Sequence, residues 1–448
     1  MANLRTFLSQ VEDSQDLVHI DKEVSREFEA SAILKAFDKG KVVVFDHVKK
    51  SSTPIVGGVC GTRDRLDLSL GIRKGEFYER LAKALADPRK PRLIEDACVL
   101  ESVDKPDLNK IPILKHYEKD AGPYITAGAV YARVDDSENV SIHRLQVIDE
   151  SHLAIRIVPR HLYRLCQKAK AKGQKALDIS ISIGLHPAIL LAASSPVRPD
   201  ISHFDVANTL LNNTMTIVKC PHVDAYAPSD AELVLEGRIL LDQNVAEGPF
   251  TDLTGTYDIQ RKQPLVELVG ILHRDKFMYQ ALLPAGSEHR LLMGMPQEVR
   301  IWEYARAVLP TASAVNMTYG GCGWLHCVVS VEKFRDGDAK NVLMAIFAAN
   351  PSIKHAVVVD NDIDAFNMDE VEWAIATRFR GDRNILLVPN VRVSSLDPVA
   401  DQELETGCKM GIDATRPFSK PKDKFELAKI PRSDYVDNIL KEKESQQP

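Results

Sequence analysis

The chain has 448 residues, of which 44% are hydrophobic and 27% are charged, and its formal net charge is −6. At roughly 150 residues per domain, this length predicts two or three domains with ordinary globular cores. The acidic balance argues against a general nucleic-acid binder, because such a protein needs a basic face. No apolar run approaches the roughly 18 residues of a membrane span, so we expect no membrane partner.

The seven cysteines are odd in number and include no CxxC pair. This pattern fits neither a disulfide framework nor a zinc ribbon. Reduced thiols in a cytoplasmic protein are the simplest interpretation. The acidic, polar start of the chain lacks the cationic and apolar segments of a secretory signal, and we therefore expect a cytoplasmic location.

The first part of the chain predicts a mixture of helices and strands. Residues 26–39 place apolar side chains near helical spacing, 41–48 form a β-branched run typical of a strand, and 76–86 predict a second helix. From 127 to 285, crowded strand-like runs favour a barrel or an antiparallel sheet. These runs are 128–134, 144–148, 153–158, 215–219, 232–241, 265–272 and 277–282, with helices inserted at about 161–173 and 203–213.

The last third of the chain predicts a second domain. Residues 297–308 form one helix bounded by Pro296 and Pro310, and a β-α-β-α-β rhythm follows from 313 to 388. We expect an α/β fold in which a larger domain (1–295), a linker helix (296–312), a smaller α/β oligomerisation domain (313–425) and a tail helix (426–448) follow one another. The polar tail either frays or docks on a neighbouring subunit.

Three short segments combine residue types that suit chemistry. Asn139 and Arg144 stand five residues apart in NVSIHR, where an amide oxygen and a guanidinium could meet one ligand. The segment 159–161, Pro-Arg-His, ends a strand and opens a helix, which suits an anion or a metal–phosphate pair. Glu247 and Asp252 flank the turn EGPFTD, and paired acids near an arginine can take different protonation states. Each segment alone also fits a surface arginine, a helix start or a solvated turn, so the hypothesis depends on their co-occurrence.

Together and in this order, the segments resemble the UbiD decarboxylases, which use prenylated FMN. NVSIHR is similar to the family's Asn-x-x-x-x-Arg segment, and EGPFTD is similar to its EGPFxD turn. HPAILLAAS (186–194) resembles a loop near a monovalent ion, and VVVDNDIDAFNMDEVEWAIATRFRGDRN (357–384) resembles part of the family's C-terminal domain. The resemblance runs from about residue 5 to 425 and implies that the larger domain binds prenylated FMN on a split β-barrel core.

The resemblance also implies roles for single residues. Arg144, Glu247 and Asp252 match the catalytic network: Arg144 would pair with Glu247 and keep it ionised, and a protonated Asp252 would supply the proton that replaces CO₂. The implied cofactor contacts are Asn139, Ser141, Ile142, His143, Arg144, Leu145, Arg160, His161 and Glu247.

The same resemblance implies two metal ions. Asn139, His161 and His203 would bind a Mn²⁺ ion that clamps the flavin phosphate, and K⁺ or Na⁺ would occupy a second site. The family's third Mn²⁺ ligand is a glutamate, so His203 is a departure, and Asp205 stays an alternative. Lys340 is one candidate for a lysine at the flavin phosphate.

The substrate side is expected to include Ile157, Arg160, Leu253 and His289. His289 lies in GSEHRLLMG, which resembles members that act on aromatic or heteroaromatic acids; a capped turn is the structural alternative. The implied reaction is reversible, non-oxidative decarboxylation of such an acid, with a furan, pyrrole, indole or benzenoid ring. The implied partners are the acid, CO₂, a flavin prenyltransferase that supplies the cofactor, and further copies of the chain in a homodimer or a dimer-based hexamer.

Two other classes of function stay open. An FMN-dependent oxidoreductase on a split barrel would consume NAD(P)H and would not need Arg144. A non-catalytic subunit of a multi-subunit carboxylase would take up no cofactor, and only the departure at His203 points to it.

Overall fold

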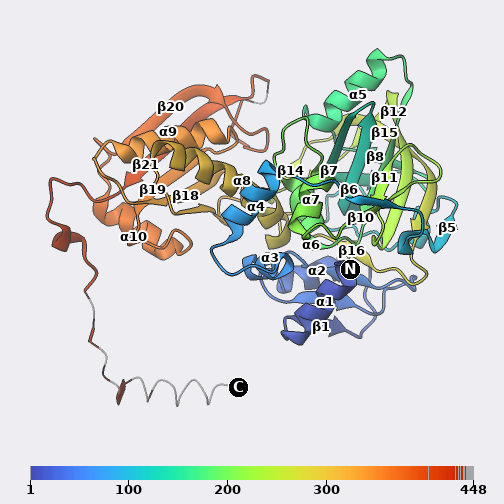
Figure 1. Ribbon diagram of the computed structural model, residues 1–448, viewed down its shortest axis with the longest axis horizontal. Coiled ribbons are helices and arrows are strands. Elements are labelled where there is room, and N and C mark those ends of the chain that lie inside the picture. The colour runs from blue at the N-terminus through green and yellow to red at the C-terminus, as the bar shows by residue number, and fades with distance from the viewer. Residues whose placement is uncertain are drawn as a thin grey trace.

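The computed structural model describes residues 2–401, 403–428, 430, 431, 433, 435, 436 and 439. Figure 1 shows a larger part, built around a barrel, and a smaller part made of a sheet with helices on it. The long helix α8 (Ser287–Val308) connects the two parts along the chain.

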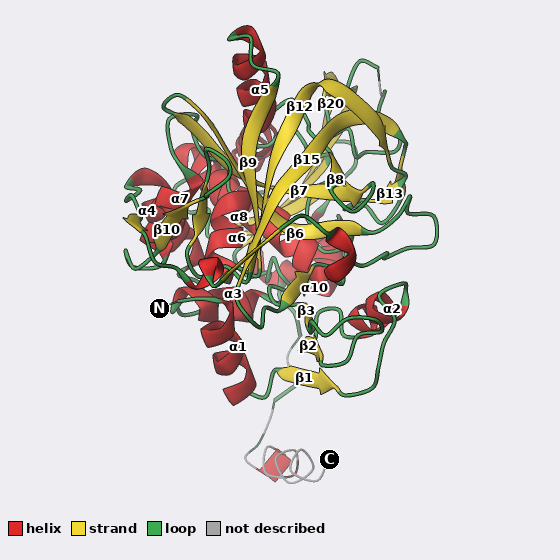
Figure 2. Cartoon of the chain, turned by 90° about the vertical axis from the view of Figure 1, so that its right-hand side faces the viewer, coloured by secondary structure: helices red, strands yellow, loops and turns green. Residues whose placement is uncertain are grey.

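A closed barrel of six antiparallel strands forms the centre of the larger part (Figure 2). The strand order is β12-β9-β6-β7-β8-β15, and β12 pairs with β15 to close it. Its strands are β6 (Tyr124–Val134), β7 (Ser137–Val147), β8 (His152–Ile155), β9 (Ala176–Ile183), β12 (Leu233–Glu247) and β15 (Arg261–His273). The predicted barrel is confirmed, although the strand over ALDISISI in β9 was not predicted.

Smaller elements surround the barrel. One four-stranded sheet has the strand order β1 (Leu17–Ile20), β2 (Val42–Phe45), β3 (Ile55–Gly57) and β16 (Tyr279–Ala281). Residues near 280 therefore pair with the N-terminal segment of the chain. A three-stranded sheet contains β4 (Arg92–Ile94), β10 (Thr216–Lys219) and β11 (Tyr226–Pro228), and β5 (Ser102–Asp104) pairs with β15. The helices here are α1 (Leu4–Asp13), α2 (Glu29–Ala36), α3 (Arg63–Leu70), α4 (Phe77–Ala86), α5 (His161–Ala171), α6 (Pro187–Ser194) and α7 (His203–Leu210), with short 3₁₀ turns at Cys98–Leu100 and Leu108–Lys110.

Two sequence-based expectations about helices were wrong. The segment 186–194, expected to be a loop, is the buried helix α6: Pro187 occupies its first turn, and the Ala188 N–H donates to the His186 ring. The helix expected to start after Pro296 begins at Ser287 and carries Pro296 inside it. A proline removes only one helical N–H, and the buried side chains on both sides of Pro296 hold the helix together.

The smaller part is a five-stranded sheet in the order β17-β18-β19-β21-β20. Its strands are β17 (Ala314–Met317), β18 (His326–Val331), β19 (His355–Asp360), β20 (Ile385–Arg392) and β21 (Thr406–Ala414). Helices α8 and α9 (Asp338–Ala349) pack on one face, α10 (Met368–Arg378) packs on the other, and a 3₁₀ turn follows at Lys422–Phe425. The predicted rhythm is confirmed up to β20, while β21 was missed; most of the expected tail helix at 426–448 lies outside the described residues.

Polar contacts join the two parts beside α8. The Tyr78 hydroxyl of α4 donates to the Val315 carbonyl at 2.5 Å and accepts from the Val315 N–H at 3.1 Å, on edge strand β17. Glu298 of α8, which is fully buried, pairs with Arg63 and accepts the Met317 N–H. The position of the C-terminal sheet is therefore fixed by hydrogen bonds as well as by the connecting helix.

All seven cysteines are free thiols, as expected. Within the described residues, no helix combines the length and the apolar character needed to cross a bilayer.

Candidate active site

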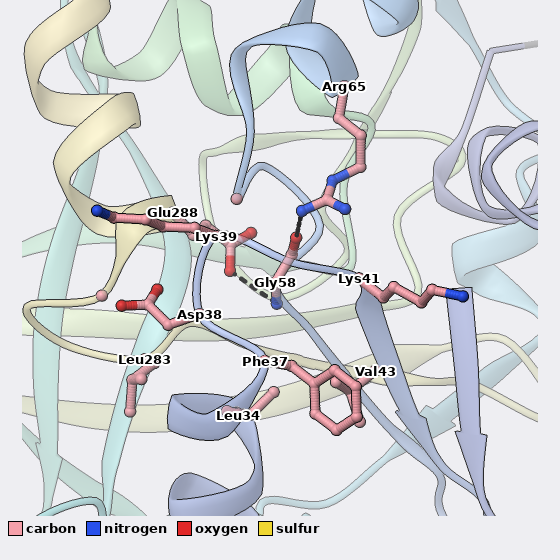
Figure 3. A pocket seen from close by; sticks show the side chains of 12 residues that line it. Leu34, Phe37, Asp38, Lys39, Lys41, Val43, Gly58, Arg65, Leu283 and Glu288 are labelled. Atoms are coloured by element: carbon pink, nitrogen blue, oxygen red, sulfur yellow. Dashed lines mark hydrogen bonds between the residues drawn. The ribbon is translucent and has the colours of Figure 1, made fainter. Parts of the chain in front are cut away.

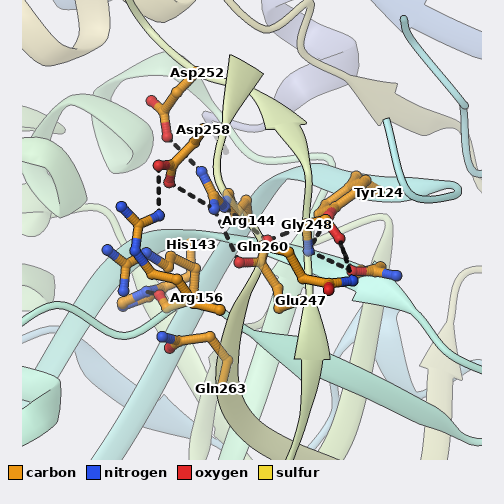
Figure 4. A network of polar contacts seen from close by, with 12 residues as sticks. Tyr124, His143, Arg144, Arg156, Glu247, Gly248, Asp252, Asp258, Gln260 and Gln263 are labelled. Carbon is orange, nitrogen blue, oxygen red and sulfur yellow. Dashed lines mark hydrogen bonds and ion pairs between the residues drawn. The ribbon is translucent and has the colours of Figure 1, made fainter. Parts of the chain in front are cut away.

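The site is built around Arg144 of β7 and Glu247, the last residue of β12 (Figure 4). Arg144 Nε and Nη2 donate to the two carboxylate oxygens of Glu247, each at 2.9 Å. The Arg144 side chain is 8% exposed and that of Glu247 is fully buried. A buried, two-pronged pair of this kind is held in one geometry, because the planar guanidinium matches both carboxylate oxygens.

The same guanidinium contacts two further acids. Arg144 Nη1 lies 2.6 Å from Asp252 Oδ2, and Nη2 lies 3.0 Å from Asp258 Oδ2. The expected pair of Arg144 and Glu247 is present, and the same guanidinium also contacts Asp252 and Asp258. Asp258 was missed altogether: it lies in β14 (Tyr257–Asp258), which pairs with β13 (Phe250–Thr251). The sequence signal that could have found it is TDLTGTYD, where a tight turn folds a second acid back towards the first.

The backbone turn after Glu247 is fixed by its neighbours. The Gly248 N–H donates to Gln146 Oε1 at 3.0 Å, and the Tyr124 hydroxyl lies 3.2 Å from Glu247 Oε1. Gly248 has φ +88°, and a Cβ there would lie 3.2 Å from the Ile259 carbonyl oxygen, so glycine suits this position. Glu247 is thus held by a tyrosine as well as by Arg144.

The charges in this cluster stabilise one another. Burial alone would lower the pKa of Arg144, but its hydrogen bonds to Glu247 and the nearby acids outweigh burial and raise the pKa. Burial would raise the pKa of Asp258, but Arg261 and Arg144 outweigh it and lower the pKa. Burial, followed by the charge of Glu247, raises the pKa of Tyr124, which therefore stays a neutral hydroxyl. Arg144 is therefore a cation that contacts three carboxyl side chains.

The three expected Mn²⁺ ligands come from separate elements that meet near the start of β7. Asn139 is buried on β7, and the rings of His161 (α5) and His203 (α7) lie 6.4 Å apart between centroids. Burial lowers the pKa of His203 to about 3, and burial followed by Arg164 and Arg160 lowers that of His161. Both rings are therefore neutral; His203 Nδ1 accepts the Val140 N–H at 3.3 Å, and the ring also hydrogen-bonds to the Ser195 backbone.

A hydrogen-bonded chain orients the amide of Asn139. His143 Nδ1 lies 2.9 Å from the Arg156 carbonyl oxygen and must donate to it, so Nε2 accepts from Ser141 Oγ at 2.8 Å. Ser141 Oγ in turn accepts from Asn139 Nδ2 at 2.7 Å. Asn139 Oδ1 is then the amide atom left for a cation. One amide oxygen and two imidazoles fit a divalent ion such as Mn²⁺.

Other groups at this position are less suited to a metal. Within the described residues, no three His, Cys, Asp or Glu side chains are grouped so that they could hold a metal ion. Asp205, the alternative ligand, lies near Glu138; burial, followed by the charge of Glu138, raises the pKa of Asp205 to about 6. A metal here would therefore need Asn139 and oxygen ligands from a bound phosphate.

The remaining expected cofactor contacts differ in accessibility. Ile142 is half-buried on β7, whereas the Leu145 side chain is fully buried in the barrel core. Arg160 precedes His161 and is exposed, with its guanidinium carbon 5.7 Å from the centre of the Trp324 ring. Arg160 therefore reaches from the barrel towards the smaller part.

The expected substrate residues differ in their surroundings, and Ile157 belongs to the hydrophobic core of the barrel. Ile157 and Leu253 are buried, at 8% and 0% exposure. His289, in the first turn of α8, accepts the Ala285 N–H at 3.2 Å, and its pKa is lowered by burial against the opposing charge of Asp252. Cys322 Sγ of the smaller part lies 3.9 Å from the Thr254 carbonyl oxygen, two residues beyond Asp252. The loop that carries Cys322 and Trp324 thus closes over the Asp252 turn.

A separate cavity of about 20 Å³ lies beneath the first turn of α8 (Figure 3). Glu288 lines it and accepts the N–H groups of Gly58 and Cys60 at 3.1 and 2.9 Å. Burial raises the pKa of Glu288 to about 7, despite these two hydrogen bonds. Space for about one water molecule cannot hold a flavin or an organic acid, so this cavity is not the substrate site.

Comparison with known proteins identifies the family. The N-terminal domain of 3-octaprenyl-4-hydroxybenzoate carboxy-lyase matches residues 8–85, its Rift-related domain matches 92–287, and its C-terminal domain matches 290–414. The chain belongs to the UbiD family. This confirms the resemblance seen in the sequence and the expected class of enzyme, a carboxy-lyase.

UbiD relatives cover almost the whole chain. The anhydromevalonate phosphate decarboxylase of Methanothermobacter thermautotrophicus is 44% identical over 425 residues, which are 94% of this chain and 99% of that protein. The protein of the same name from Methanosarcina mazei is 42% identical over 429 residues, 95% and 99% of the two chains. The UbiD-class enzyme HmfF of Pelotomaculum thermopropionicum, solved in complex with FMN, is 38% identical with a TM-score of 0.93 and covers 96% of this chain and 97% of its own.

An evolved dimeric form of HmfF, solved with prenylated FMN, has a TM-score of 0.89 at 36% identity and covers 96% of this chain and 97% of its own. The fold with its closed barrel is thus that of UbiD-class enzymes.

Proposed function

We propose that this UbiD enzyme uses prenylated FMN to remove CO₂ from an α,β-unsaturated acid that carries a phosphate group. The observation that carries the proposal is the buried two-pronged pair of Arg144 and Glu247, with the more accessible Asp252 on the same guanidinium. The relatives at 42–44% identity are anhydromevalonate phosphate decarboxylases. Loss of water from mevalonate phosphate yields an unsaturated acid with a phosphate, which supports this substrate class.

A cofactor is required by the chemistry of the substrate. CO₂ loss from an sp² carbon leaves electrons that have no adjacent group to accept them, and prenylated FMN supplies that electron sink. Asn139, His161 and His203 would hold its phosphate through a divalent metal, because their donor atoms are an amide oxygen and two neutral imidazoles.

The two acids are suited to different tasks. Glu247 is fully buried and bonded twice to Arg144, so its task would be to fix the position of the arginine. Asp252 is 20% exposed and makes one contact with Arg144, so it can exchange its proton with a substrate or with water. Asp252 is therefore the group that would return a proton to the carbon that loses CO₂. Arg144 would orient the substrate carboxylate from the same side.

A second candidate substrate is an aromatic or heteroaromatic acid. Ile157, Leu253 and Trp324 are buried apolar side chains, and Leu253 directly follows Asp252; apolar walls suit a ring. A flavin prenyltransferase as cofactor supplier, a monovalent ion, and a homodimer or a dimer-based hexamer remain predictions.

The test begins with the cofactor. The chain would be co-expressed with a flavin prenyltransferase, and the mass of its bound flavin would be measured. CO₂ release would then be followed with anhydromevalonate phosphate, its unphosphorylated analogue, and a panel of aromatic acids. Decarboxylation of the phosphorylated acid is the expected result; oxidation of NAD(P)H without CO₂ release would instead point to a flavin oxidoreductase.

A further inference from the structure

The loop between β8 and α5 carries two arginines without a carboxylate partner. Arg156 and Arg160 lie at its two ends, and neither side chain forms an ion pair or a hydrogen bond with any residue that the structure describes. Elsewhere on the barrel, Arg133 and Arg238 pair with Asp224 and Asp178. A guanidinium offers five N–H donors, so two such groups on one short loop present a large unfilled capacity for an anion.

Arg156 lies near two acids that already have arginine partners. Asp258 contacts Arg144 and Arg261, and Glu247 contacts Arg144. Figure 4 shows Arg156 beside His143 on the Asp258 side of this network, and its carbonyl accepts from His143. Burial, followed by the charges of Arg261 and Arg144, lowers the pKa of Arg156. A half-buried cation next to two other cations is stabilised when an anion binds to it.

Arg160 lies at the other end of the loop, where its charged neighbour is Arg392 of the smaller part. Its guanidinium lies over Trp324 of the smaller part, and the Arg160 N–H bonds to the Val158 carbonyl in a tight turn. The expected metal ligands Asn139, His161 and His203 meet near the start of β7, and Arg160 directly precedes His161. The Arg156 carbonyl lies at the other end of the chain of hydrogen bonds that runs through Ser141 and His143. Arg156 thus lies beside the Arg144 network, and Arg160 lies beside the expected metal position.

We propose that Arg156 and Arg160 bind the phosphate monoester of the substrate and so select phosphorylated acids. This inference rests on the proposed function. Arginine matches a phosphate better than lysine does, because its planar fork donates two parallel hydrogen bonds to two oxygens. A dianion suits two guanidinium groups, whereas Arg144 already donates to Glu247, Asp252 and Asp258. The phosphate of the flavin is the other possible source of such an anion, and the experiment separates the two.

The experiment compares Arg156→Gln, Arg160→Gln and the double variant with wild type. Arg238→Gln is the matched control, because it removes an arginine from the same barrel where that arginine pairs with Asp178. Three quantities are measured: flavin per chain, kcat/KM for anhydromevalonate phosphate and for its unphosphorylated analogue, and the calorimetric Kd of inorganic phosphate. We expect kcat/KM for the phosphorylated acid, and only for that acid, to fall roughly 10- to 100-fold in each site variant. A hydrogen bond to a charged group typically contributes a factor of about this size. Inorganic phosphate should bind wild type and Arg238→Gln, and bind the double variant more weakly.

The outcomes distinguish the alternatives. Equal losses for both acids, or loss of flavin with an unchanged ratio between them, would overturn the proposal and assign the arginines to the cofactor. If wild type decarboxylates neither acid, the proposed function fails, but the calorimetry still decides about the anion site. Phosphate that fails to bind wild type, or that binds the double variant equally well, overturns the inference in either case.

Discussion

Arg144 Nη1 lies 2.6 Å from Asp252 Oδ2, so the guanidinium that clamps buried Glu247 also holds the acid nearest to solvent. One arginine therefore couples the two acids that the sequence had placed in separate roles. Because Asp252 makes a single contact with Arg144 and Glu247 makes two, removal of either acid should have different consequences.

Asp252→Asn should reduce turnover by about 10²–10⁴, the typical contribution of a general acid, while flavin content stays unchanged. Asparagine keeps the contact shape but carries no transferable proton. Deuterium exchange into the product in D₂O, followed by mass spectrometry, should fall in parallel. Asp242→Asn, which alters a surface pair with Lys170, is the control. Exchange at the wild-type rate would mean that another group is the acid.

His161→Ala should give protein with little bound flavin or manganese. The reason is that His161 would be one of two neutral imidazoles at the metal position. Absorbance of the purified protein and elemental analysis measure both losses. His152→Ala, which removes a surface histidine paired with Asp149, should retain both. Full flavin and metal content in His161→Ala would remove this residue from the ligand set.

His289→Ala should change the order of preferred acids more than the flavin content. His289 lies near Asp252 at the gap between the two parts, and its ring is held by the Ala285 N–H. Competition between pairs of acids, measured as relative kcat/KM, gives that order directly. If the order stays the same, His289 serves only to cap the turn before α8.

Stability should fall as pH rises from about 5 to 8 because of Glu288. Its pKa is raised by burial from the ordinary value of 4.5 to about 7, so the folded state binds a proton that the unfolded state has lost. This contribution to the free energy of unfolding is complete below the pKa that Glu288 has in the unfolded chain. It is lost as the pH rises through the pKa that Glu288 has in the folded chain, and its size is about 3 kcal/mol. Denaturant unfolding at several pH values should show this slope in wild type, and Glu288→Gln should flatten it. Parallel pH profiles would contradict the prediction.

Local patterns predicted most of the fold. The strands around Arg144 and Glu247 were found because their side chains follow strand periodicity, and the barrel followed from their crowding. The start of helix α8 was predicted wrongly because a proline such as Pro296 normally marks a helix boundary. Here the buried side chains on both sides of Pro296 compensate for the one helical hydrogen bond that the proline removes. The strand β9 was missed between two helices, since its serines and Asp178 hide an alternating pattern.

The site was harder to predict than the fold. Asn139, Glu247 and Asp252 stood out through motifs, but Asp258 belongs to no motif and joins the cluster only because β14 folds back onto β13. The sequence also could not show that one guanidinium reaches three carboxylates, because that depends on distances across the barrel mouth. That Arg156 has no carboxylate partner among the residues described by the structure is likewise visible only in three dimensions.

The hydrogen bonds of Tyr78 have a consequence for how the chain meets other molecules. An edge strand exposes N–H and C=O groups that can recruit a strand from another chain. At β17 the N–H and the carbonyl of Val315 already bond to the Tyr78 hydroxyl, so the N-terminal segment shields this margin of the sheet. The opposite margin is β20, where Leu387 is 57% exposed. Any cross-chain extension of the sheet should therefore be one-sided, and it should begin at β20.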